Sequence, residues 1–98
     1  MRRSEAITEL ERRANALQMR GAAAAYLFGS TARDEAGPGS DLDLFIDIEP
    51  GRMFSLFDLV GMKLFLEDEL RVKVDLATRG GLHPLLRADI ESSAIRVV

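Results

Sequence analysis

The sequence predicts an α/β (α+β) fold in which helices pack on a small mixed β-sheet of three to four strands. Segments with the alternation or the short apolar runs of strands follow one another along the chain, and segments with helical periodicity lie between them. The predicted strands are residues 22–28, 41–48 and 72–77, with a short closing strand at residues 94–98. The predicted helices are residues 4–20 and 53–70, with a short one at residues 85–91. The 98 residues are predicted to form one domain, residues 1–98, around one modest core.

Residues 4–20 are predicted to form an amphipathic helix. Ser4 is a suitable N-cap residue, and Gly21 is a suitable residue to end the helix. Apolar residues recur at helical spacing and define one face: Ile7, Leu10, Ala14 and Leu17. Most charged residues lie outside this face, which is therefore expected to pack on the core.

Residues 53–70 form the longest predicted helix. Its predicted core stripe consists of Met53, Phe57, Val60 and Leu64, broadened by Leu56 and Leu59. Three more large apolar residues exceed a one-sided stripe: Phe54, Met62 and Phe65. Two interpretations stay open for this excess, because these residues belong either to the core or to a surface that a partner protein covers.

The predicted strands differ in how clearly the sequence marks them. Residues 22–28 carry four alanines, which favour a helix by propensity, but small side chains let a covering helix approach closely and the turn that follows needs a strand before it. Residues 41–48 alternate strictly, with Leu42, Leu44, Ile46 and Ile48 on one face and Asp41, Asp43, Phe45 and Asp47 on the other. Residues 72–77 place Val72, Val74 and Leu76 on one face and Lys73, Asp75 and Ala77 on the other.

A Gly29-Ser30 pair follows the first predicted strand. Glycine lets the backbone leave the strand in a tight turn, and Ser30 opens a short predicted helical segment, residues 31–36. The free amides and the positive dipole end of this segment suit a phosphate group. A turn at residues 37–40 ends it, so the sequence predicts a phosphate cradle between the first two strands.

Carboxylates stand on one face of the second strand. Asp41 and Asp43 are at positions i and i+2, and their mutual repulsion destabilises the ionised pair, which argues against a role as stabilisers of the fold. A hard divalent cation such as Mg²⁺ takes oxygen ligands and would relieve this repulsion while leaving room for phosphate oxygens. Asp75, in the strand expected to neighbour this one, is predicted as a third carboxylate of the same site.

The joint pattern Gly29-Ser30-x10-Asp41-x-Asp43 resembles the signature of the DNA polymerase β-type nucleotidyltransferase superfamily. More narrowly, Gly-Ser-Thr-Ala-Arg followed by Ser-Asp-Leu-Asp-Leu resembles the minimal nucleotidyltransferase (MNT) domains of bacteria and archaea. The likeness extends over nearly the whole chain, through the segments at residues 71–78 and 82–90.

This resemblance implies a polymerase β-like palm that moves a nucleoside monophosphate from an NTP, expected to be ATP, to an acceptor hydroxyl. The implied catalytic residues and metal ligands, for one or two Mg²⁺ ions, are Asp41, Asp43 and Asp75. The implied nucleotide-binding residues are Gly29, Ser30 and Arg33. Lys63 and Arg79 stay outside the predicted site, because exposed cations are usually only solubilising.

The resemblance also implies a partner. In MNT pairs, a small helical HEPN protein is a ribonuclease toxin, and the MNT protein is the antitoxin that adds AMP to it, so the chain is expected to act on a partner protein in a hetero-oligomer. One alternative is a non-catalytic antitoxin that masks its partner by binding. Asp34 supports that alternative, because it stands where the family often has glycine and is predicted to alter the turn or repel a triphosphate. Another alternative is a nucleotidyltransferase that acts on a small molecule or an RNA end.

The composition excludes several other classes. A net charge of −3 provides no basic footprint for direct binding of nucleic acid. The absence of cysteine excludes disulfides and thiolate metal sites, and it fits a cytoplasmic protein. No apolar run reaches the roughly 20 residues of a membrane span, and the charged start of the chain does not resemble a signal peptide.

Overall fold

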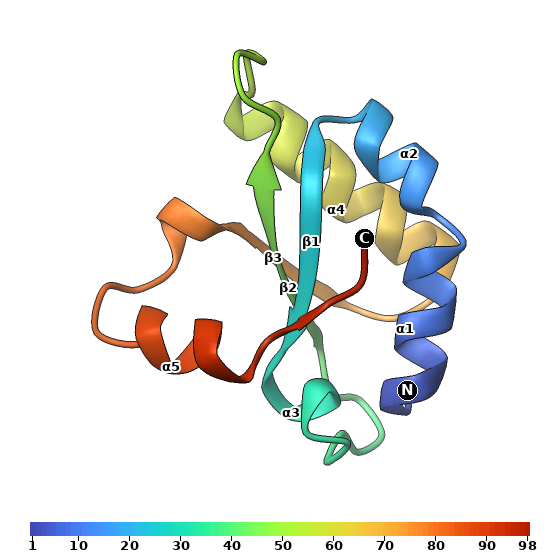
Figure 1. Cartoon of the computed structure of the whole chain (residues 1–98). Helices are drawn as coiled ribbons and strands as arrows, with labels where there is room; N and C mark the ends of the chain where they lie inside the picture. The colour runs from blue at the N-terminus through green and yellow to red at the C-terminus, as the bar shows by residue number, and fades with distance from the viewer.

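The computed structural model describes residues 1–98 as a four-stranded sheet with helices on both of its sides (Figure 1). The strands are β1 (Ala22–Phe28), β2 (Leu42–Ile48), β3 (Val74–Thr78) and β4 (Ile95–Arg96). The helices are α1 (Arg3–Glu11), α2 (Ala14–Met19), α3 (Gly29–Ala32), α4 (Leu56–Leu70) and α5 (Arg87–Ser93), and a single 3₁₀ turn, η1 (Arg79–Gly81), follows β3. The predicted mixed α+β fold is therefore confirmed.

The strands lie in the order β3-β2-β1-β4. β1 pairs antiparallel with β2 and with β4, whereas β2 and β3 are parallel and connected by the crossover through α4. The first strand forms over the predicted residues despite its alanines, because both its edges are hydrogen-bonded and its inward side chains are buried. Tertiary pairing thus outweighs helix propensity here.

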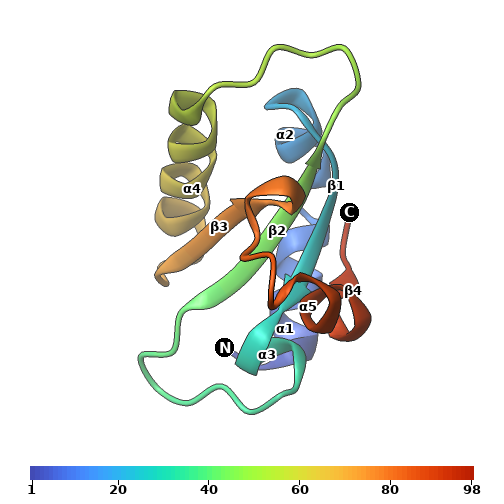
Figure 2. The ribbon, with the colours of Figure 1, turned by 90° about the vertical axis from the view of Figure 1, so that its left-hand side faces the viewer.

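The main core lies between one face of the sheet and α1, α2 and α4. Side chains from all three helices meet the inward residues of the strands, and the largest contributors are Leu10, Leu17, Leu27, Leu42, Leu44, Ile46, Met62 and Leu66. Helix α5 lies on the other side of the sheet from α1 and α2 (Figures 1 and 2). No helix in the structure has the length and apolar character needed to span a bilayer.

The prediction of one continuous helix over residues 4–20 is wrong. The chain turns at Arg12 and Arg13 and divides it into α1 and α2. The Arg13 guanidinium donates to the Glu9 carbonyl at 2.8 Å and to the Glu9 carboxylate at 2.9 Å, so it satisfies the C-terminal end of α1 at the break. Ser4 is not the N-cap, because α1 begins at Arg3.

The predicted core stripe of the long helix is also wrong. The buried residues of α4 are Met62, Leu66 and Leu70, whereas Met53, Leu56, Phe57, Val60 and Leu64 are exposed. Phe54 and Phe65 are partly buried and pack against the core, so all three residues left open by the sequence, Phe54, Met62 and Phe65, lie on the core side. Leu59 of the predicted stripe packs there as well. Both sides of α4 carry apolar residues at helical spacing, and only one of the two sides can pack on the sheet.

Shorter elements shift at their ends. Helix α3 begins at Gly29 and ends at Ala32, earlier than the predicted segment 31–36. Helix α5 begins at Arg87 because a turn occupies the residues before it, and β4 is only two residues long. Helix α4 begins after Ser55, whose hydroxyl accepts the Asp58 amide at 3.3 Å while the Asp58 carboxylate accepts the Ser55 amide at 2.8 Å.

Candidate active site

The turn from β1 into α3 brings the backbone against a carboxylate. Gly29 has φ +72°, in the left-handed region that favours glycine. A Cβ atom at this position would lie 2.3 Å from Oδ2 of Asp43. A side chain at position 29 is therefore excluded by lack of space as well as by the backbone conformation. The approach follows from the strand pairing, which sets Phe28 opposite Asp43. The predicted phosphate loop and the predicted metal strand therefore meet at Gly29 and Asp43.

Two of the predicted carboxylates share one level of the sheet. The parallel register of β2 and β3 pairs Asp43 with Asp75. Asp43 is half-buried, and Asp75 is exposed on β3, the edge strand. Burial raises the pKa of Asp43, the charges of Asp75 and Asp41 raise it further, and Arg33 opposes the shift. Negative charge is therefore concentrated around Asp43, where a cation would be favoured.

Asp41 lies outside the paired residues of the strands. It is exposed and precedes the first residue of β2. The structure contains no group of three His, Cys, Asp or Glu side chains gathered closely enough to hold a metal ion. The donor set nevertheless fits Mg²⁺, because the carboxylates supply oxygen ligands and their repulsion around Asp43 is what a divalent cation would relieve. The structure therefore brings Asp43 and Asp75 together at the centre of the candidate site, and Asp41 lies just before β2 at its rim.

The loop residues predicted to bind nucleotide lie in and directly after α3. Ser30 is half-buried in this helix, and its carbonyl accepts the Glu35 amide at 2.8 Å, which closes the loop. Arg33 is exposed, and its Nε donates to Glu35 at 3.1 Å. An exposed pair of this kind contributes roughly 0–1 kcal/mol, so an incoming phosphate could replace Glu35 at little cost.

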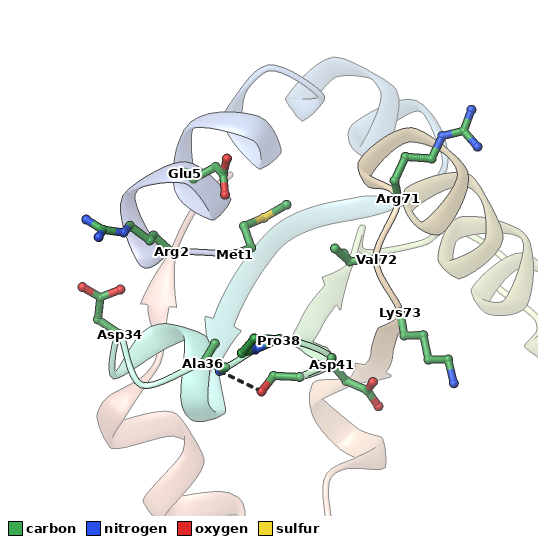
Figure 3. Close-up of a pocket in the computed structure, with 13 residues that line it drawn as sticks. Met1, Arg2, Glu5, Asp34, Ala36, Pro38, Asp41, Arg71, Val72 and Lys73 are labelled. Carbon is green, nitrogen blue, oxygen red and sulfur yellow. Dashed lines mark hydrogen bonds between the residues drawn. The ribbon is translucent and has the colours of Figure 1, made fainter.

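Asp34, directly after Arg33, contacts the N-terminal helix. It has φ +59°, so it adopts the left-handed conformation that explains a preference for glycine at this position. Its Oδ1 accepts the backbone N–H of Arg3 at 3.0 Å, at the first residue of α1. Figure 3 shows the Asp34 carboxylate beside the N-terminal helix and well separated from Asp41. The carboxylate thus caps the first turn of α1, from a backbone conformation that glycine would also adopt.

A cavity of about 990 Å³ opens beside Asp41. Three segments line it: the N-terminal residues of the chain, the loop from Asp34 to Asp41, and residues 71–73 (Figure 3). Its cationic lining residues are Arg2, Arg71 and Lys73. Since Asp41 belongs to both, the cavity extends the carboxylate site toward the N-terminus of the chain.

Arg79, which the sequence predicts to be only a solubilising cation, is half-buried and forms ion pairs in the structure. Its Nε and Nη2 donate to the two oxygens of Asp47 at 2.7 and 3.0 Å, and Nη1 donates to Glu91 on α5. The guanidinium also lies 4.9 Å from the ring centre of Tyr26 and 5.0 Å from that of Phe45. Arg79 therefore fastens α5 to the face of the sheet that carries Asp43. The only sequence signal for it was Asp47, an acid left without a function on the same strand face.

Comparison with known proteins adds independent information. A family model described as a nucleotidyltransferase domain matches residues 5–97. The chain is 37% identical over 93 residues to "Putative protein adenylyltransferase MJ0435" of Methanocaldococcus jannaschii, a match that covers 94% of this chain and 98% of that protein. It is 40% identical over 73 residues to "Putative protein adenylyltransferase MJ0126" of the same organism, covering 72% of this chain and 71% of that protein.

Solved structures with the same arrangement also exist. A "putative minimal nucleotidyltransferase" superimposes with a TM-score of 0.81 at 38% identity, over 97% of this chain and 95% of that one. A toxin–antitoxin structure with AMP-PNP superimposes with a TM-score of 0.73 at 18% identity, over 90% of this chain and 72% of that one. The second likeness shows a common fold.

Proposed function

Because the chain belongs to the nucleotidyltransferase domain family, we propose that it transfers AMP from ATP to a hydroxyl group of a partner protein in a Mg²⁺-dependent reaction. The observation that carries this proposal is the contact between the Gly29 backbone and the Asp43 carboxylate, with Asp75 paired beside it. A loop suited to phosphate and a pair of carboxylates suited to a cation meet at one point, which is what the transfer of a phosphoryl group to a hydroxyl requires.

The reaction would proceed by displacement at the α-phosphorus of ATP. The acceptor oxygen forms a bond to this phosphorus while the bond to the bridging oxygen of the β-phosphate breaks, and pyrophosphate leaves. We assign the hydroxyl proton to Asp75 or to water beside it, since Asp75 is an exposed carboxylate on the edge strand.

The other residues would bind and orient the nucleotide. Ser30 and the amides around Gly29 would hold the terminal phosphates, and Arg33 would neutralise charge on them after leaving Glu35. Asp43 and Asp75, with Asp41 at the rim, would hold Mg²⁺, which when bound would stabilise the charge on the entering and leaving oxygens. Positioning and electrostatics would thus provide most of the rate acceleration.

The nature of the acceptor is supported by the relatives. Two of them carry the name "Putative protein adenylyltransferase", and one structure of the same fold is a toxin-antitoxin with AMP-PNP. We therefore propose that this chain is an antitoxin whose acceptor is a toxin protein of the small helical HEPN type. The exposed apolar face of α4 gives such a partner a surface to bind.

The same apolar face favours a second candidate, an antitoxin that masks its partner without modifying it. Asp34 supports this candidate only through repulsion of a triphosphate, because its carboxylate caps α1 from a backbone conformation that glycine would also adopt. It predicts tight association of the two proteins with no covalent change.

The test is the intact mass of the co-expressed partner after incubation with this chain, ATP and MgCl₂. We expect one or more added AMP units, which disappear when EDTA is present or when the chain carries Asp43→Asn. Asp89→Asn is the matched control, because Asp89 is an exposed carboxylate on α5. An unchanged mass despite tight association would refute the transferase and leave the masking antitoxin.

A further inference from the structure

The outer face of α4 exposes five large apolar side chains, and these residues define it here: Met53, Leu56, Phe57, Val60 and Leu64. Their exposed fractions are 94% for Met53, 72% for Leu56, 88% for Phe57, 44% for Val60 and 57% for Leu64. Four of the residues recur at helical spacing on one side of α4, and Met53 continues the row just before the N-cap. A contiguous apolar patch of this kind typically marks an interaction site.

This face cannot turn inward. The opposite side of α4 is fixed on the sheet by Met62, Leu66 and Leu70, all of which are buried in the main core. The capping box between Ser55 and Asp58 fixes the start of the helix as well. In Figure 2, α4 forms the outer layer of the molecule next to β3, with its far side uncovered. None of the 98 residues therefore covers the outer face.

The C-terminal end of α4 is acidic. Three consecutive acids, Glu67, Asp68 and Glu69, occupy the last turn, where the helix dipole is also negative and which contains no basic residue. The Glu67 carboxylate accepts the Val74 amide at 2.9 Å, and Glu69 lies 3.5 Å from Arg13, but Asp68 is exposed and belongs to no ion pair of the chain. A ligand for this helix should thus place positive charge beside its C-terminal end.

We propose that the outer face of α4 binds the acceptor protein of the reaction described above, through an amphipathic helix that carries basic residues at one end of its apolar stripe. The apolar side chains of the face define the stripe, and Asp68 with the negative helix end defines the position of the cations. This inference rests on the proposed function for the role of the partner, and on the apolar and acidic features of α4 for its chemistry.

A second copy of the chain fits this face less well. Parallel pairing of two α4 helices would place acidic ends together, and antiparallel pairing would place the acidic end of one copy beside exposed Asp58 of the other. Arg20 lies 4.5 Å from the ring centre of Phe65 and Arg52 donates to the Met19 carbonyl at 2.7 Å, so both are engaged, and Lys63 stands in the middle of α4, away from its acidic end. Like charges without compensation disfavour self-association.

The position of α4 also suits an acceptor. Leu70 ends the helix, and β3 begins at Val74 only four residues later and carries Asp75 on the edge of the sheet. Val74 and Leu76 face the core beneath α4, so Asp75 points to the opposite face of the sheet, and a partner on the outer face of α4 would reach it around the edge strand. Binding to the outer face of α4 would thus place a partner beside the edge of the sheet that carries Asp75.

The test begins with p-benzoylphenylalanine as a photo-crosslinking residue at Phe57, in cells of the native host, with the same residue at Leu85 as control. Leu85 is 84% exposed and lies outside α4, so it matches Phe57 in exposure and apolar character. We expect one protein to be cross-linked from position 57 and none from position 85. Mass spectrometry then identifies this protein, whose sequence should contain an amphipathic helix with basic residues at one end.

The identified protein is purified, and its affinity for the chain is measured without nucleotide. Leu64→Glu should weaken binding at least tenfold, whereas Leu85→Glu should leave it unchanged. Asp68→Lys should weaken binding several-fold at low salt, while Asp89→Lys should not. The circular dichroism spectra of these variants should match that of the unmodified chain, because every substituted side chain is exposed.

The inference is overturned if position 57 cross-links to a second copy of the chain, if it cross-links to nothing, or if Leu64→Glu leaves the affinity intact. An Asp68→Lys variant that binds as tightly as the unmodified chain overturns the assignment of a basic partner. The proposed function is judged separately by adding ATP and MgCl₂ to the bound pair. Binding through α4 with no transfer of AMP refutes the transferase and leaves the interface, whereas transfer that survives Leu64→Glu refutes the interface alone.

Discussion

The carboxylate of Asp34 accepts the backbone N–H of Arg3 at 3.0 Å, although the two residues are 31 positions apart in the sequence. Arg3 also donates from its guanidinium to the carbonyl of Ala32, at 3.5 Å. The first turn of α1 is thereby joined to Ala32, the last residue of α3, and to Asp34, the two neighbours of Arg33. Since Asp34 has φ +59°, it occupies a glycine-like conformation and in return caps a helix that has no side-chain cap of its own.

Substitutions at Asp34 should separate the stabilisation by the helix cap from the cost of the left-handed backbone conformation. Asp34→Gly loses the cap, about 1 kcal/mol, but relieves a left-handed backbone strain of about 1 kcal/mol, so its free energy of unfolding should be nearly unchanged. Asp34→Ala loses the cap and keeps the strain that Asp34 already has, so it should be less stable than the unmodified chain by about 1 kcal/mol. Urea unfolding measures both. Equal stability of the two variants would mean that the left-handed strain contributes nothing measurable, and an Asp34→Ala variant as stable as the unmodified chain would mean the same of the cap.

The contact between Gly29 and Asp43 predicts a coupled pair of substitutions. Gly29→Ala introduces a Cβ atom that would lie 2.3 Å from Asp43 Oδ2 and strains a residue with φ +72°, so it should destabilise the protein by about 2–3 kcal/mol and abolish activity. In an Asp43→Ala background only the backbone strain remains, about 1 kcal/mol. A double-mutant cycle followed by urea unfolding checks this. Additive effects would contradict the close approach.

Much of the fold could be predicted from local pattern. The alternation of residues 41–48 predicted β2 to within one residue, and the turn chemistry at Gly29 required a strand before it, which fixed β1. The side of α4 that faces the sheet could not be predicted. Met53, Phe57, Val60 and Leu64 have the same spacing as the buried side, and only the neighbouring strands decide between the two.

The candidate site was predictable in its residues but not in its geometry. Spacing indicated Asp43 and Asp75, yet their pairing depends on the register between β2 and β3, which no local pattern encodes. The roles of Asp34 and Arg79 depend on contacts with Arg3 and Asp47, at separations of 31 and 32 residues. Long-range contacts of this kind leave no periodic signal in the sequence.

Removing charge at the centre of the site should abolish transfer without harming the fold. Asp43→Asn retains the shape of the side chain but removes one of the carboxylates that repel one another there. We expect at least a 100-fold loss of AMP transfer, and a melting temperature equal to or above that of the unmodified chain in the absence of metal. Calorimetry and the mass assay measure the two quantities. A markedly lower melting temperature would assign Asp43 a structural role.

The Arg79 cluster predicts a dependence of stability on pH. Hydrogen bonds from Arg79 lower the pKa of Asp47 below its ordinary value of 3.8 and that of Glu91 below 4.5. Groups with a lowered pKa stabilise the folded state fully above their ordinary values, and this stabilisation is lost as the pH falls through the lowered values. Arg79→Leu removes the hydrogen bonds and the cation above Tyr26, so it should be less stable than the unmodified chain at pH 7.

This difference in unfolding free energy should shrink steadily below about pH 4.5, because Glu91 and Asp47 then become protonated in the unmodified chain as well. Urea unfolding at intervals between pH 7 and pH 3 measures it, and Arg87→Leu is the control. Arg87 makes a single exposed contact to Glu91 at 3.3 Å, so its loss should change stability by less than about 0.5 kcal/mol at any pH. A difference between Arg79→Leu and the unmodified chain that is constant with pH would show that Arg79 acts through its packing on Tyr26 and Phe45, and that its ion pairs contribute little.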